Sequence, residues 1–141
     1  MQRLGLLILS AALVVGSVAA SAQERFSSSE DAVTALVDAA KAEDQKALLK
    51  VLGPKGQQIV SSGDPVADRA TREKFVTAYG TKHSITRDSL DQATLVIGDN
   101  DWPFPIPLVR KHDGWQFDTG AGLDEILRRR IGRNELAAIQ V

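Results

Sequence analysis

The chain has 141 residues, a net charge of −1, 43% hydrophobic residues and 25% charged residues, which suits a globular domain and excludes a disordered chain. The near balance of charge argues against a nucleic-acid-binding protein, because no basic excess is available to contact phosphates. No cysteine is present, so the chain has neither a disulfide framework nor a cysteine for lipid attachment.

Residues 1–22 have the pattern of a secretory signal peptide. Arg3 is the positive n-region, residues 4–18 are apolar, and residues 20–22 (Ala-Ser-Ala) form a small-x-small cleavage site. Glycines and serines interrupt the apolar run, which is shorter than the ~20 apolar residues that a spanning helix needs. The pattern therefore predicts cleavage after Ala22, a periplasmic or secreted protein, and no stable membrane span after cleavage.

The N-terminal half of the mature chain is predicted to be helical. Apolar residues recur there at helical spacing, and each segment follows a capping signal. The expected segments are 29–42, 45–52, one turn within 55–61, and 65–79. Asp44 and Asp64 are the expected N-caps of two of these helices, Pro65 takes a first helical position, and Gly80 is the expected stop.

A run of strands follows the helices. Residues 83–88 and 94–97 have strand composition, and residues 102–118 are predicted to form a β-hairpin with an Asp-Gly turn. Three prolines alternate with apolar residues in its first strand, so one edge of that strand has no N–H groups to donate and should not pair. The side chains expected in the core are Trp102, Phe104, Ile106, Leu108, Trp115 and Phe117.

The pattern becomes helical again after Asp118. Apolar residues form a stripe over 123–131, Gly132 is expected to interrupt it, and a last segment runs over 135–141. Asp118 or Thr119 is the expected N-cap, and the glycines at 120 and 122 are expected in a turn. The last segment has no stop signal, so the helix is expected to continue beyond the end of this sequence.

Helices followed by antiparallel strands predict an α+β domain over residues 23–141, in which the helices lie on one face of a curved sheet and a C-terminal helix follows. This order resembles the cone-shaped fold of nuclear transport factor 2 and of SnoaL-like proteins. The resemblance implies a pocket between helices and sheet, but it carries no function.

Such a pocket has four candidate ligand-binding residues: Tyr79, His83, Asp101 and Trp102. The main prediction is a non-catalytic domain that binds an unknown small ligand or envelope protein. One alternative is a small-molecule hydrolase or isomerase that pairs His83 with an aspartate, although a lone histidine is more often structural. A further alternative is an interaction module whose open sheet edge and unfinished last helix would dock onto a C-terminal half that follows this sequence.

Residues 118–121 (Asp-Thr-Gly-Ala) resemble the catalytic motif of aspartic proteases. That chemistry needs two aspartates that share a proton, and here a dimer would supply the second one. Only one helix-length segment, rather than a run of strands, separates this motif from its possible second half at 131–134, so a strand-to-helix corner explains it better. Zinc spacing and nucleotide motifs are missing, and residues 99–101 offer too few ligands for calcium, so no metal or cofactor is predicted.

Four runs of the chain together resemble a bacterial exported family called domain of unknown function 2950. The runs are FSSSEDAVTALVDAAKAEDQKALLKVLGP, VSSGDPVADRATREKFVTAY, DWPFPIPLVRKHDGWQFDT and EILRRRIGRNELAAIQV. The resemblance covers essentially the whole mature chain and implies export, with no activity or catalytic residue to carry over. It also implies that residues 23–141 are the N-terminal part of a longer protein, because family members continue past the last run.

Overall fold

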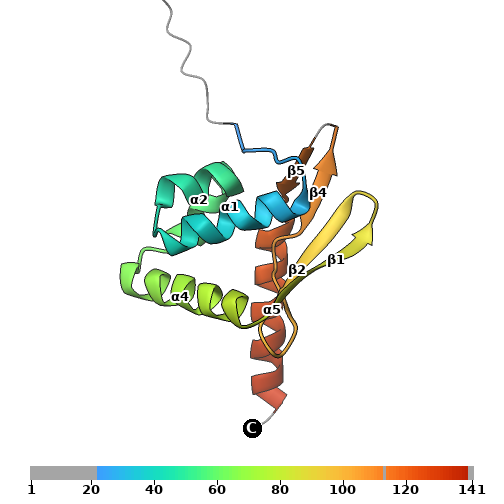
Figure 1. Ribbon diagram of the computed structural model, residues 1–141. Coiled ribbons are helices and arrows are strands. Elements are labelled where there is room, and N and C mark those ends of the chain that lie inside the picture. The colour runs from blue at the N-terminus through green and yellow to red at the C-terminus, as the bar shows by residue number, and fades with distance from the viewer. Residues whose placement is uncertain (1–21, 113, 140–141) are drawn as a thin grey trace, which may run out of the picture.

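The computed structural model describes residues 22–112 and 114–139, of which 134–139 are described by backbone alone. The elements are α1 (Ser29–Lys41), α2 (Gln45–Leu52), η1 (Pro54–Gly56), α3 (Gln57–Val60), α4 (Pro65–Thr81), β1 (His83–Ser89), β2 (Gln92–Ile97), β3 (Trp102–Pro103), β4 (Leu108–Lys111), β5 (Gly114–Phe117) and α5 (Thr119–Ile139). This mixture of helices and antiparallel strands confirms the α+β class (Figure 1). Nearly all of the predicted signal peptide, the turn residue Asp113 and the last two residues lie outside the described residues.

The first helices begin where the sequence predicts. Asp44 and Asp64 each accept a hydrogen bond from the backbone N–H three residues later, at 3.1 Å in both cases. Ser28 caps α1 in the same way at 3.0 Å. Such side chains satisfy N–H groups that have no partner within the helix, which fixes where each helix starts.

Two glycines that were expected to stop or interrupt helices do not. Helix α4 continues through Gly80 to Thr81, whose Oγ1 donates to the carbonyl oxygen of Thr77 at 3.0 Å. Helix α5 likewise passes through Gly132 without a break. Both expectations were wrong because a glycine costs a helix only about 1 kcal/mol relative to alanine and keeps its backbone hydrogen bonds.

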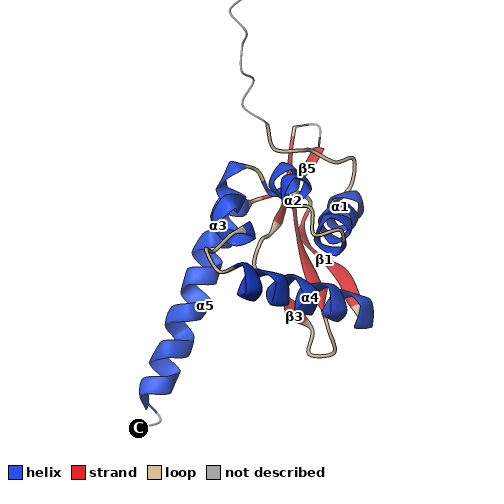
Figure 2. Cartoon of the chain, turned by 90° about the vertical axis from the view of Figure 1, so that its left-hand side faces the viewer, coloured by secondary structure: helices blue, strands red, loops and turns tan. Residues whose placement is uncertain are grey.

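The five strands form one antiparallel sheet in the order β1-β2-β4-β5, and β3 pairs with the end of β2. Ala93 of β2, Leu108 of β4 and Phe117 of β5 pair in a row across neighbouring strands, and all three are fully buried. Helices α1 and α2 contact β5, and α4 contacts β1 and β2. These helices therefore lie together on one face of the sheet and close the core there (Figures 1 and 2).

The predicted hairpin is shorter than residues 102–118. Only β4 and β5 form it, and residues 104–107 lie in no strand. Alternating prolines explain the gap, because a strand without N–H groups on one edge cannot complete a ladder there. The buried aliphatic and aromatic residues of the segment are as expected, with Phe104 partly buried, but Trp102 is an exception at 45% exposure. Trp102 pairs with Ile97 at the very end of β2, where the sheet itself stops.

The lead-in before α1 is tied to the core, which the sequence did not indicate. The side-chain amide of Gln23 donates to the carbonyl oxygens of Phe117 at 2.7 Å and Val51 at 3.1 Å. Phe26 exchanges two backbone hydrogen bonds of 2.8 Å with Trp115. The outer edge of β5 is thereby partly covered, whereas β1 pairs, among the described strands, with β2 alone.

Helix α5 begins at Thr119, so the expected turn at residues 120–122 is instead the first turn of the helix. Thr119 donates to the carbonyl oxygen of Leu52 at 2.6 Å, and Gly122 is buried against Ile106. The C-terminal half of α5 extends beyond the other elements in both views (Figures 1 and 2). Within the described residues, no helix has both the length and the apolar character to span a membrane.

Candidate functional site

Three elements meet at the end of the sheet where β1 begins. His83 of β1 pairs with Ile97 of β2, which pairs in turn with Trp102 of β3. Tyr79 lies in the last turns of α4, and Asp101 immediately precedes β3. The fold therefore brings the four candidate binding residues to one end of the sheet.

Tyr79 and His83 form a stacked pair. Their ring centroids are 3.8 Å apart and their planes differ by 6°. His83 Nδ1 lies 2.9 Å from the backbone carbonyl oxygen of Tyr79, so this nitrogen carries the proton and donates it. The imidazole is exposed and held against α4. This placement argues against a His83–aspartate pair inside a pocket.

Asp101 forms an ion pair with Lys82, with 2.7 Å between Nζ and Oδ1. The hydrogen bond to Asp101, the charge of Asp101 and the charge of Asp99 raise the pKa of Lys82 above its ordinary value. Both side chains are more than half exposed, so solvent screens the pair and it adds little to stability. Its effect is to hold the β2–β3 turn against the end of α4.

Replacing Asp101 with asparagine should lower the pKa of Lys82 toward its ordinary value. Asparagine also tolerates the left-handed φ of 50° at this position, so the turn should keep its shape. Because folding raises this pKa, the small stabilisation is fully present below the unfolded pKa of lysine and is lost as pH rises through the folded pKa. An NMR titration of the Lys82 side chain measures the change. Asp91→Asn, which removes the partner of Arg110 instead, should leave Lys82 unaffected.

A row of aromatic rings connects α4 to α5. Phe75 lies 5.2 Å from Phe104, and Phe104 lies 6.3 Å from Trp102, measured between ring centroids. The guanidinium of Arg129 lies over the other end of the row, 5.3 Å from the Trp102 ring. A cation over an aromatic face is attractive, so this contact stabilises the position of α5.

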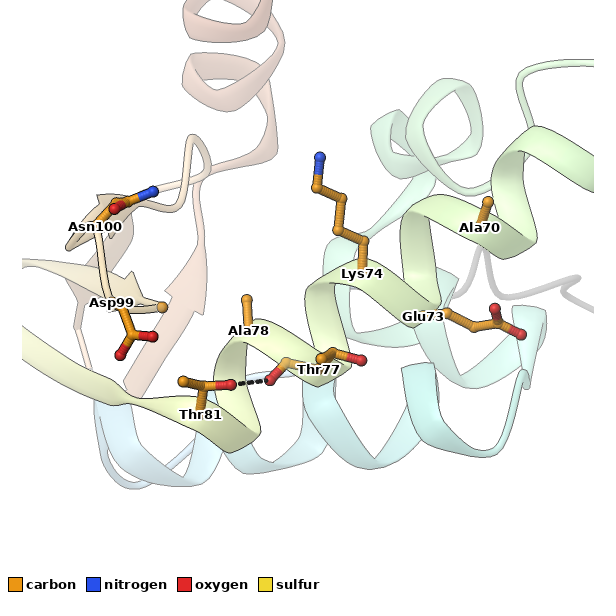
Figure 3. A pocket seen from close by; sticks show the side chains of 9 residues that line it. Ala70, Glu73, Lys74, Thr77, Ala78, Thr81, Asp99 and Asn100 are labelled. Atoms are coloured by element: carbon orange, nitrogen blue, oxygen red, sulfur yellow. Dashed lines mark hydrogen bonds between the residues drawn. The ribbon is translucent and has the colours of Figure 1, made fainter.

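A groove of about 500 Å³ lies between α4 and the β2–β3 turn (Figure 3). Its lining residues are Ala70, Glu73, Lys74, Thr77, Ala78, Thr81, Gly98, Asp99 and Asn100. In the close-up, the Lys74 side chain rises from the helix into the open space, and the turn that carries Asp99 and Asn100 faces it. The groove is open to solvent and offers one ammonium, two carboxylates, two hydroxyls and an amide.

None of the four candidate residues lines this groove. They lie beside it, and the space between helices and sheet is filled by the apolar core, which includes Leu36, Val51 and Leu95. Two features of the sequence relate to the groove, although neither predicts it without the fold. Small residues recur on α4 at Ala70 and Ala78, and the polar turn at 98–101 comes next to the helix only because β1 and β2 pair.

Asp118 caps α5 at the corner between β5 and the helix. Its Oδ1 accepts a hydrogen bond from the backbone N–H of Ala121 at 3.2 Å, as the strand-to-helix interpretation predicts. The second motif at 131–134 lies in the same helix, more than two turns away, so the two segments cannot face each other within one chain. Across residues 22–112 and 114–139, no cluster of three or more metal-binding side chains is found.

The fold and this surface define an α+β domain with an open, polar groove beside an exposed tryptophan. The chain belongs to a family described as protein of unknown function (DUF2950), whose model matches residues 23–141. This match confirms the family resemblance seen in the sequence. No curated protein and no solved structure matches the chain.

Proposed function

We propose that the chain is a non-catalytic binding domain of an exported bacterial protein, and that its groove receives a polar ligand or partner of the cell envelope. The groove between α4 and the β2–β3 turn is the observation that carries this proposal. Export rests on the signal pattern of residues 1–22, and the periplasm or the medium is the proposed location.

The lining of the groove suits a hydrogen-bonding ligand without a strong charge. Lys74 is balanced by Glu73 and Asp99, so neither a polyanion nor a polycation is favoured. The open shape suits an extended segment or a partner surface better than an enclosed small molecule, since pockets for small molecules bury most of the ligand surface. Gly98 has a left-handed φ of 77° in this turn, and the turn lies next to α4, since a Cβ added to Gly98 would be in van der Waals contact with that of Ala78 at 3.7 Å.

The cone-like architecture is part of the same proposal. Helices on one face of an antiparallel sheet support it, as does the order of helices before strands. In such a cone the binding surface would open at the rim, where α4 meets β1 and β2. The exposed ring of Trp102 lies at this rim and supplies an apolar contact beside the polar groove.

A hydrolase or isomerase centred on His83 is the weaker alternative. It would need a carboxylate beside the imidazole, whereas Asp101 is engaged by Lys82 and the His83 Nδ1 proton by the carbonyl of Tyr79. The two functions differ in one measurable respect. An enzyme would consume its ligand, and a binding domain would return it unchanged.

Filling the groove tests the proposal. Soluble peptidoglycan fragments and an unstructured peptide mixture are added to isotope-labelled protein, and amide shifts are followed by NMR. We expect shifts at Thr77 and Asn100, and we expect Ala70→Trp to reduce the affinity at least tenfold by occupying the groove. Leu90→Trp is the matched control, because Leu90 is 79% exposed in the β1–β2 turn. Binding that Ala70→Trp leaves unchanged would refute the groove as the site.

A further inference from the structure

Helix α5 has two different faces before residue 134. One face contacts the body of the protein through Gly122 against Ile106 and Arg129 over Trp102. The other face carries Leu127 and Ile131, which are 54% and 49% exposed. Leu123 lies one turn before them and is partly buried. The three apolar residues recur at i, i+4 and i+8 and so form one stripe along the outer side of the helix.

We propose that this outer stripe is the interface of a homodimer, in which two α5 helices pack antiparallel across a two-fold axis at Leu127. The pattern is symmetric about that residue. Leu123 of one copy would contact Ile131 of the other, and Leu127 would contact Leu127 of the other copy. A two-fold interface has to be self-complementary in this sense, because the same surface serves both sides.

Charges beside the stripe support this arrangement. Asp124 and Arg128 lie on the same flank of the stripe, one turn apart. In an antiparallel pair, the same flank of each helix meets the same flank of the other. With a rise of ~1.5 Å per residue, Asp124 of one copy and Arg128 of the other then differ by only about 3 Å in height along the helix axes. The side chain of Arg128 is 72% exposed. Among the described residues it pairs only with Glu125 of its own helix, at 3.2 Å, so its guanidinium can accommodate a second carboxylate.

Two other surfaces fit a partner less well. The free edge of β1 could add a strand, but it carries Arg87 and Asp88 and has an irregular register between Arg87 and Ser89. Charges and irregularities of this kind oppose edge-to-edge pairing. An anionic membrane is also disfavoured, because Asp124 interrupts the basic flank that an interfacial helix would present to lipid headgroups.

A disulfide cross-link tests the dimer directly, since the chain has no cysteine. A residue on the two-fold axis lies next to its own copy, so Leu127→Cys should form a cross-linked dimer under mild oxidation. Leu90→Cys is the matched control: its position is more exposed than Leu127 but lies in the β1–β2 turn, far along the chain from α5. We expect several-fold more covalent dimer from Leu127→Cys than from Leu90→Cys at equal concentration.

Sedimentation velocity supplies an independent readout. The stripe covers only about two helical turns, so we expect a weak dimer whose fraction rises with concentration and falls at least tenfold in Leu127→Glu. Leu90→Glu should leave the fraction unchanged. Equal cross-linking at both positions, or a wild-type monomer at all concentrations, would overturn the proposal. Binding of phosphatidylglycerol vesicles by a monomer, lost in Leu127→Glu, would overturn it in favour of a membrane surface. The dimer surface on α5 is separate from the groove, so the outcome of these experiments does not depend on whether the groove binds a ligand.

Discussion

Replacing Phe117 with alanine is expected to lower the free energy of unfolding by about 3–5 kcal/mol, the range for aromatic residues in protein cores. Phe117 has no exposed surface. It pairs with Leu108 of β4, and its ring and that of Phe104 meet edge to face at a centroid distance of 6.2 Å. Alanine would leave a cavity between the sheet and the helices that cover it.

This loss of free energy is large relative to the total stability of the domain. A domain of this size has a total stability of about 5–15 kcal/mol, so the variant would unfold at much lower urea concentration. Urea denaturation followed by circular dichroism measures the change. Leu90→Ala is the control, and at an exposed position it should stay within about 0.5 kcal/mol of the wild type. A loss below 1 kcal/mol for Phe117→Ala would mean that the core of the domain lies elsewhere.

Local signals in the sequence sufficed for the helices of the N-terminal half. The capping residues Ser28, Asp44 and Asp64 determine where α1, α2 and α4 begin, and each acts within three residues of its own position. Apolar spacing then indicated which side of each helix would be buried. Such features are readable because their causes lie within one or two turns of the chain.

The glycines were harder to interpret for a related reason. Gly80 and Gly132 look like helix stops in isolation, but a helix continues wherever its hydrogen bonds and neighbouring contacts outweigh a cost of about 1 kcal/mol. Gly122 has a different role, since it lets α5 approach Ile106. That role depends on a contact between residues 16 positions apart, which local sequence patterns do not record.

In the candidate site, too, the sequence indicated what is local and missed what depends on the tertiary fold. Sequence reasoning selected Tyr79, His83, Asp101 and Trp102 for their chemistry, and the fold does bring them to one end of the sheet. Whether they bind a ligand stays a prediction. The groove beside them could not be foreseen, because it depends on how the β2–β3 turn lies against α4, and pairing of β1 with β2 sets that position.

Replacing Gly122 with alanine is expected to destabilise the fold, although alanine is the better helix former. An added Cβ would lie 2.6 Å from Cγ1 of Ile106 and 3.0 Å from its Cα. Ile106 is buried and sits between two prolines, so its backbone has little freedom to move away. Overpacking of this kind typically costs about 1–3 kcal/mol, which exceeds the ~1 kcal/mol gained from helix propensity.

Gly132→Ala in the same helix is the matched control, and its effect should have the opposite sign. Among the atoms that the structure describes, none lies within 4 Å of a Cβ added there, so only the propensity gain of about 0.5–1 kcal/mol remains. Urea denaturation of the two variants compares them directly. In Gly122→Ala the helix should also shift and draw Arg129 away from Trp102, which would change the tryptophan fluorescence. Stabilisation by both alanines would show that α5 does not pack against Ile106, because only that contact distinguishes the two glycines.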